Sequence, residues 1–119
     1  MKNILLLDDD PVIHQLVGKV VVSLSYGFFP CLTAAEAEEI LGKEKIDFVI
    51  CDLFLEGDFG DKLSNDFIRN IVVPRQLPFC RFTSAPSQVP EDCIGLALID
   101  KREVYADDTK LYQVLTSLV

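Results

Sequence analysis

Carboxylates follow two apolar runs of the sequence and could form a metal site. Asp8 and Asp9 come directly after the run 3–7, and Asp52 comes directly after the run 46–51. If the two runs are neighbouring parallel strands, these three carboxylates converge and raise one another's pKa. A cation must then compensate their charge, and oxygen ligands without histidine or cysteine nearby suit Mg²⁺. The pattern therefore predicts a magnesium site that also receives a phosphate oxygen.

Two further side chains follow apolar runs and could bind a phosphoryl group at the same place. Thr83 follows the run 77–82, and Lys101 lies two residues after the run 94–99. A carboxylate can accept a phosphoryl group as an aspartyl phosphate, while a hydroxyl and an ammonium bind its other oxygens. The sequence therefore predicts phosphoryl chemistry in which Thr83 supplies the hydroxyl and Lys101 the ammonium.

The elements that must position these residues alternate along the chain between short apolar runs and segments of helical period. Strands are expected at 3–7, 28–32, 46–51, 77–82 and 94–99. Helices are expected from Pro11 after the N-cap Asp10, after the capping box 33–36, across 63–71, and from 108 to the end. This alternation predicts an α/β fold with a doubly wound, five-stranded parallel sheet, whose ligands bind outside the carboxyl ends of the strands.

One segment interrupts the alternation. Between Thr83 and Ile94 the chain carries Pro86 and Pro90 and hardly any helical stripe. Proline inside a helix removes a hydrogen bond and clashes with the preceding turn. We therefore expect the fourth helix, between the fourth and fifth strands, to be short or missing.

Length and charge limit what the chain can do. Its 119 residues predict one domain, 1–119, without room for a separate effector module. The formal net charge of -8 argues against direct binding of nucleic acid or an anionic membrane. The first apolar run is too short for a signal peptide or a membrane span, so we expect a cytoplasmic protein. Four cysteines without a C-x-x-C pair are expected to be reduced thiols without chemistry.

Four segments and one glycine carry a resemblance to a known family. The segments are 5–11 (Leu-Leu-Leu-Asp-Asp-Asp-Pro), 48–53 (Phe-Val-Ile-Cys-Asp-Leu), 82–85 (Phe-Thr-Ser-Ala) and 98–101 (Leu-Ile-Asp-Lys), and Gly60 lies eight residues after the aspartate of the second. Together they resemble the receiver domain of two-component response regulators, of the chemotaxis-regulator type, over essentially the whole chain. The resemblance implies the flavodoxin-like receiver fold.

The resemblance also implies a role for each acidic residue. Asp52 corresponds to the residue that is phosphorylated by a partner histidine kinase or phosphotransfer protein. Asp9 and Asp52 correspond to direct ligands of Mg²⁺ or Mn²⁺, Asp8 acts on the metal through water, and the backbone carbonyl of Phe54 completes the protein ligands. Thr83 corresponds to the switch hydroxyl that moves toward the phosphoryl group, and Lys101 to the lysine that pairs with it.

What the resemblance implies for function is a signalling switch with modest catalysis. Such domains catalyse their own Mg²⁺-dependent phosphorylation, from phosphohistidine or small phosphodonors, and their own dephosphorylation. They signal by switching a protein–protein interaction, here with an unknown output protein, and a homodimer is left open. Phe54 and Ala85 would flank the phosphoryl group with apolar surface, so we expect slow dephosphorylation.

The chain departs from the family pattern at several positions. Arg102 replaces the proline that usually follows the lysine, so we expect a trans peptide and a slightly shifted loop. Leu98 stands where an aromatic switch residue is usual. Leu55-Glu56, with Gly57 and Asp58 beyond, replaces the Met-Pro that usually follows shortly after the phosphoacceptor. We infer that the phosphorylation chemistry is retained while the output route is altered.

Two other interpretations are left open. Asp8 and Asp10 have the D-x-D spacing of haloacid-dehalogenase-like phosphatases, in which Asp8 would be the nucleophile and Asp10 the acid. That interpretation leaves Asp52 unexplained, and the chain is short for that fold. The second alternative is a pseudo-receiver that binds a protein partner without phosphorylation, which failure to bind Mg²⁺ would support.

Overall fold

A computed structural model describes residues 1–55 and 61–119 of the chain, and the sequence features at Gly60 and within 56–58 lie outside the described residues. Within the described part, five parallel strands form one sheet in the order β2-β1-β3-β4-β5. The strands are β1 (Asn3–Leu7), β2 (Gly27–Cys31), β3 (Phe48–Cys51), β4 (Phe79–Thr83) and β5 (Leu98–Asp100). This confirms the predicted doubly wound α/β fold.

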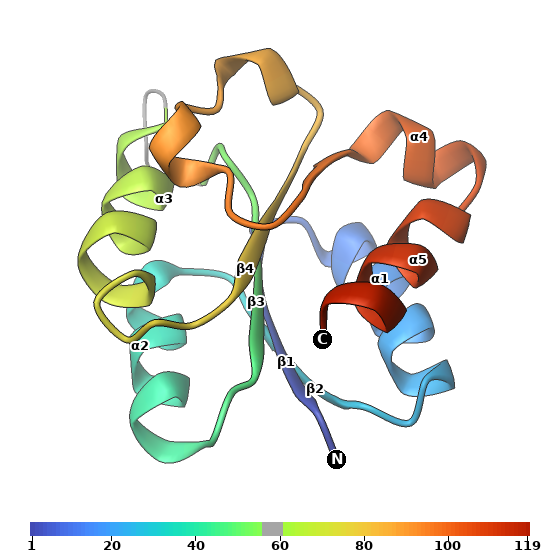
Figure 1. Cartoon of the computed structure of the whole chain (residues 1–119), viewed down its shortest axis with the longest axis horizontal. Coiled ribbons are helices and arrows are strands. Elements are labelled where there is room, and N and C mark those ends of the chain that lie inside the picture. The colour runs from blue at the N-terminus through green and yellow to red at the C-terminus, as the bar shows by residue number, and fades with distance from the viewer. Residues whose placement is uncertain (56–60) are drawn as a thin grey trace.

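Helices cover both faces of the sheet, as Figure 1 shows. On one face lie α1 (Pro11–Ser23), α4 (Lys101–Ala106) and α5 (Thr109–Leu118), and on the other lie α2 (Ala34–Lys43) and α3 (Lys62–Phe67), which continues into the π-helical turn η1 (Ile68–Val72). None of the helices in the described ranges is long and apolar enough to cross a membrane.

The central strand β1 shows why the apolar runs are continuous rather than alternating. Ile4 and Leu6 are buried in the core formed with α1 and α5, whereas Leu5 and Leu7 are buried in the core formed with α2 and α3. Successive side chains of a strand point to opposite faces, so a strand covered on both sides must be apolar at every position.

The predicted helix starts are confirmed by their caps. Asp10 accepts a hydrogen bond from the Val12 N–H at 2.9 Å, with Pro11 in the first helical position of α1. Thr33 accepts from the Glu36 N–H at 3.2 Å and begins α2. Both caps satisfy donors that a helix N-terminus leaves unpaired.

The connection between β4 and β5 differs from a regular helix, as predicted. It consists of two single-turn 3-10 segments, η2 (Pro86–Gln88) and η3 (Glu91–Cys93). The fifth strand is shorter than the predicted run 94–99, because Gly95 adopts φ +76 and turns the chain before β5. A side chain at Gly95 would collide with the backbone oxygen of Phe79.

The segment after β5 corrects one expectation and confirms another. The peptide between Lys101 and Arg102 is trans, as expected. A loop was expected there, but helix α4 begins at Lys101 itself, because Asp100 accepts from the Arg102 N–H at 2.9 Å and acts as an N-cap. The sequence Asp-Lys-Arg-Glu supports a short helix that the family pattern had obscured.

Candidate functional site

The predicted carboxylates converge at one edge of the sheet. Asp8 and Asp9 follow β1, Asp52 follows β3, and the two strands pair in register with Leu7 beside Cys51. Carboxylate oxygens of Asp8, Asp9 and Asp52 all lie within 4.8 Å of one another. Asp8 is fully buried, Asp52 is 6% exposed, and Asp9 is half-buried. The three carboxylates thus lie together at the strand ends, as predicted.

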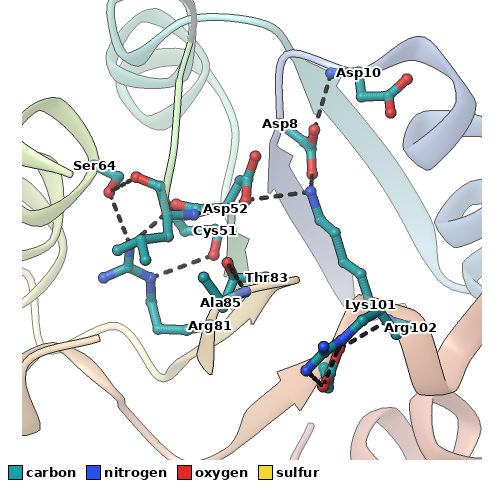
Figure 2. A network of polar contacts seen from close by, with 12 residues as sticks. Asp8, Asp10, Cys51, Asp52, Ser64, Arg81, Thr83, Ala85, Lys101 and Arg102 are labelled. Atoms are coloured by element: carbon teal, nitrogen blue, oxygen red, sulfur yellow. Dashed lines mark hydrogen bonds and ion pairs between the residues drawn. The ribbon is translucent and has the colours of Figure 1, made fainter. Parts of the chain in front are cut away.

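Lys101 reaches this cluster from the end of β5. Its Nζ lies 2.7 Å from Asp8 Oδ2 and 3.2 Å from Asp52 Oδ1, so one ammonium joins two carboxylates (Figure 2). The side chain of Lys101 is 9% exposed, and its ammonium lies 5.7 Å from the centre of the Phe82 ring. The partly apolar surroundings exclude water and strengthen both ion pairs.

Burial and the charges of neighbouring side chains shift the pKa values of Asp8, Asp52 and Lys101. Burial, followed by the charge of Asp8, raises the pKa of Asp52 to about 6 against the opposing effect of Lys101. Burial likewise raises the pKa of Asp8, although Lys101 opposes this. Burial alone would lower the pKa of Lys101, but the charges of Asp52 and Asp8 outweigh it and raise that pKa. The carboxylates thus need more positive charge than Lys101 supplies.

Thr83 ends β4 and is 1% exposed. Its Oγ1 accepts a hydrogen bond from the Ala85 N–H at 3.1 Å. Among the described contacts the hydroxyl therefore bonds to the connection that follows β4, and not to Asp52. The predicted position of Thr83 at a strand end is confirmed, while its switch role stays a prediction.

Phe54 lies two residues beyond Asp52, where its carbonyl was predicted to complete a metal site. The Leu53 N–H donates to Asp52 Oδ1 at 2.7 Å and so fixes the carboxylate against the main chain that leads to Phe54. The Phe54 residue is 39% exposed, which leaves its ring at the surface. The ligand role of its carbonyl stays a prediction.

The donor set fits a divalent cation. Asp8 Oδ1 accepts from the Asp10 N–H at 2.9 Å. The buried Asp8 Oδ2 accepts no well-aligned hydrogen bond from the described residues, and its close partner is the Lys101 ammonium. Three carboxylates against one ammonium leave negative charge uncompensated once all are ionised, and hard oxygen ligands match Mg²⁺.

Arg81 in β4 is a residue of this region that the sequence interpretation missed. It is fully buried, and it lies on the α3 side of the sheet (Figure 2). Its guanidinium has five N–H groups, and all five donate hydrogen bonds to neutral acceptors. The bonds run from Nε to Cys51 O (3.3 Å), from Nη1 to Asn65 Oδ1 (2.8 Å) and Cys93 O (3.2 Å), and from Nη2 to Asp52 O (3.0 Å) and Ser64 Oγ (2.8 Å).

The signal that could have identified Arg81 is its place in the apolar run 77–82. A charged residue in a strand buried on both faces must find hydrogen-bond partners. His14 in α1 is half-buried beside the same strand end, and its Nε2 lies 2.7 Å from the backbone oxygen of Asp8. The four cysteines are buried and free, as expected, and burial raises the pKa of Cys51 to about 12.

Comparison of sequences identifies response regulators as relatives, although no family model matches the chain. The transcriptional regulatory protein GlrR of Escherichia coli strain K12 is 37% identical over 61 residues, and QseF of Escherichia coli O157:H7 matches equally. The matched segment is 51% of this chain and 14% of each regulator. The chain thus spans a small part of the curated relatives that it matches.

Solved structures of receiver domains share the fold over nearly the whole chain. A CheY-like receiver domain from Methylobacillus flagellatus superposes with a TM-score of 0.78 at 14% identity, covering 100% of this chain and 99% of that one. The PhyR receiver domain of Erythrobacter litoralis gives 0.76 at 23% identity, covering 98% and 91%.

A third neighbour holds a metal. The receiver domain of sensor histidine kinase PA1611 from Pseudomonas aeruginosa gives a TM-score of 0.71 at 19% identity, covering 94% of each chain, and holds a magnesium ion in its active-site cleft. These comparisons confirm the resemblance to response-regulator receiver domains and the CheY-like, flavodoxin-like fold.

Proposed function

We propose that this receiver domain accepts a phosphoryl group on Asp52 from a histidine kinase or phosphotransfer protein and thereby switches a protein–protein interaction. The observation that carries the proposal is the position of Lys101 Nζ, 2.7 Å from Asp8 and 3.2 Å from Asp52, with the Asp9 carboxylate in the same cluster. This cluster combines a nucleophile with the charges that a phosphoryl group requires.

In the proposed transfer, a carboxylate oxygen of Asp52 attacks the phosphorus of phosphohistidine or of a small phosphodonor. A P–O bond forms, and the bond from phosphorus to the donor atom breaks with its electron pair remaining on the donor. Lys101 pairs with the new phosphoryl oxygens, and the Thr83 hydroxyl donates to one of them. Because burial and the charge of Asp8 raise the pKa of Asp52 only to about 6, the carboxylate is mostly ionised at neutral pH.

Asp9, Asp52 and the Phe54 carbonyl are the residues that would hold Mg²⁺ directly, with Asp8 acting through water. When bound, the cation supplies charge neutralisation for the carboxylates and for the phosphoryl oxygens. The buried Asp8 Oδ2, which has Lys101 as its close partner, supports the need for this charge.

The test is incubation of the purified protein with acetyl phosphate and Mg²⁺, followed by intact mass and peptide mapping. The expected result is one added phosphoryl group on Asp52, absent in Asp52→Asn and absent with excess EDTA. A phosphoryl group on Asp8 would instead support the phosphatase interpretation. No phosphoryl gain together with no Mg²⁺ binding would contradict the proposal and favour a pseudo-receiver.

The phosphorylated form is proposed to be long-lived. Phe54 and Ala85 stand two residues after Asp52 and Thr83 and offer no side chain that would orient a hydrolytic water. Removal of the donor should leave the phosphoryl group in place for minutes or longer, measured by mass at successive times. Loss within seconds would contradict this expectation, and Ala85→Glu would be the variant expected to shorten the lifetime.

A further inference from the structure

The buried guanidinium of Arg81 is held by hydrogen bonds without a counterion among the described residues. Its partners are three main-chain carbonyls, one hydroxyl and one side-chain amide oxygen. Burying a charge without an opposite charge is expensive unless every donor is satisfied. An apolar side chain would suit a strand interior at lower cost, so the arginine requires an explanation beyond packing.

The bonds of Arg81 concentrate on the main chain around the phosphoacceptor. Its guanidinium donates hydrogen bonds directly to the carbonyl oxygens of Cys51 and Asp52. It also donates to Ser64 Oγ, and that hydroxyl donates to the Leu53 carbonyl at 2.5 Å. The carbonyls of residues 51–53 are therefore all fixed, two by Arg81 itself and the third by the Ser64 hydroxyl that Arg81 binds. Figure 2 shows Arg81 and Ser64 beside Cys51 and Asp52.

The same guanidinium reaches the connection between β4 and β5. Nη1 donates to the Cys93 carbonyl in η3 at 3.2 Å and to Asn65 in α3 at 2.8 Å. A second arginine, Arg69, holds the same turn from the surface through two bonds to Asp92, at 2.7 and 3.0 Å. Of the two arginines, Arg81 also contacts residues 51–53, which include the phosphoacceptor and are called the acceptor loop below.

We propose that Arg81 is a positioning residue for the acceptor site: it fixes the main chain of residues 51–53, and hence the direction of the Asp52 carboxylate and of the Phe54 carbonyl. The inference deepens the proposed function and depends on it. Among the described residues the guanidinium makes no hydrogen bond or ion pair with a carboxylate, so its effect on Asp52 passes through the main chain. The planar fork matters because an ammonium cannot reproduce five directed donors.

The experiment measures Mg²⁺ affinity by isothermal titration calorimetry and, separately, the rate of phosphorylation by acetyl phosphate. The variants are Arg81→Met, Arg81→Lys and Ser64→Ala, and Arg69→Met is the matched control because it frees η3 without touching the acceptor loop. A second control, Val114→Ala, lowers stability in the core on the opposite face of the sheet. Removing the partner that orients a metal ligand typically costs 10- to 100-fold in affinity.

Arg81→Met is expected to weaken Mg²⁺ binding about 10-fold or more, and Arg81→Lys is expected not to restore it. Ser64→Ala, which changes little volume, is expected to weaken binding by roughly 3- to 10-fold, as for one lost hydrogen bond. Both control variants are expected to bind Mg²⁺ like the wild type. A loss in Val114→Ala equal to that in Arg81→Met would show a stability effect only and would overturn the proposal.

Other outcomes separate this inference from the proposed function. Folded Arg81→Met and Ser64→Ala proteins with wild-type affinity would overturn the positioning role while phosphorylation of the wild type stands. Full restoration by Arg81→Lys would overturn it too, because charge rather than geometry would then matter. If Arg81→Met does not fold, Ser64→Ala decides. A wild type that binds Mg²⁺ normally but is never phosphorylated would contradict the proposed function. The Mg²⁺ affinities of the variants would still test the positioning role of Arg81 in that case.

Discussion

Two buried cations lie on opposite sides of Asp52 and are surrounded in opposite ways. Lys101 pairs with two carboxylates, Asp8 and Asp52, whose pKa values are both raised. Arg81 has neutral acceptors only, and every one of its N–H groups is used. The cluster of Lys101, Asp8 and Asp52 therefore holds excess negative charge, whereas every donor of Arg81 is satisfied by a hydrogen bond.

The difference indicates which interactions of the site can exchange partners and which hold the main chain in one position. The carboxylates can exchange the ammonium for a metal ion, and the ammonium can exchange a carboxylate for a phosphoryl oxygen, because these interactions are mainly charge with little direction. A main-chain carbonyl bound to a guanidinium has no such alternative partner in the interior. The site thus combines exchangeable charges around Asp8 and Asp52 with a fixed frame around residues 51–53.

The largest expected effect comes from removing the charged partner. Lys101→Met, studied without metal at pH 7.5, should lower the free energy of unfolding by about 3 to 5 kcal/mol, because two buried carboxylates lose their counterion. Urea denaturation followed by circular dichroism measures the loss. Mg²⁺ should restore part of it by supplying positive charge. The exposed Lys110→Met should stay within about 0.5 kcal/mol of the wild type, and a similar small change in Lys101→Met would contradict the ion-pair account.

The next largest effect is the change in stability with pH that the titration of Asp52 produces. Its folded pKa of about 6 exceeds the ordinary value of 3.8, so the folded state binds the proton more tightly than the unfolded state. The stability that this proton contributes is complete below pH 4 and is lost as pH rises through 6, by roughly 3 kcal/mol in total. In EDTA, Asp52→Asn should therefore match the wild type near pH 4 and exceed it in stability above pH 6.

The control for this titration is Glu38→Gln on the exposed side of α2. Its stability should follow the wild-type pH profile throughout. A stability gain in Asp52→Asn that is the same at pH 4 and pH 7 would show that the amide acts through something other than the charge of the carboxylate.

Much of the charged cluster was predictable because it follows from strand order. Apolar runs fix where β1 and β3 end, and parallel neighbours bring their carboxyl ends together, so Asp8, Asp9 and Asp52 had to converge. The caps at Asp10 and Thr33 are equally local signals. The two prolines correctly indicated an irregular connection between β4 and β5.

The frame around Arg81 was not predictable in the same way. Its partners come from β3, α3 and η3, at separations of 12 to 30 residues along the chain, and no local periodicity encodes such contacts. The sequence indicates only that a charge lies in a buried strand. Helix α4 was missed because the family pattern drew attention to the absent proline at Arg102 rather than to the capping side chain of Asp100.

In the frame around Arg81, Ser64→Ala should lower the free energy of unfolding by less than Lys101→Met does in the charged cluster. Removal of the hydroxyl leaves the Leu53 carbonyl and one Arg81 N–H without their partner, which should cost about 1 to 3 kcal/mol of unfolding free energy. Mg²⁺ should stabilise this variant no more than it stabilises the wild type, whereas it should stabilise Lys101→Met by more, because only Lys101→Met lacks a positive charge that the cation can replace. Ser87→Ala, exposed in η2, is the matched control, and equal recovery by Mg²⁺ in both buried variants would remove the distinction between the two groups.

The smallest effect is expected at the surface, where Arg69 and Asp92 hold η3 from outside. Exposed ion pairs add little to global stability and are screened by salt, so Asp92→Asn should unfold like the wild type. Its effect should be local: the Cys93 N–H, which donates to Pro90 O at 2.9 Å, should exchange faster with deuterium. High salt should produce the same acceleration in the wild type and none in Asp92→Asn.

The Leu53 N–H, held within the Arg81 frame, should exchange at the same rate in all these conditions. An acceleration there would show that the surface pair, and not Arg81 alone, supports the acceptor loop.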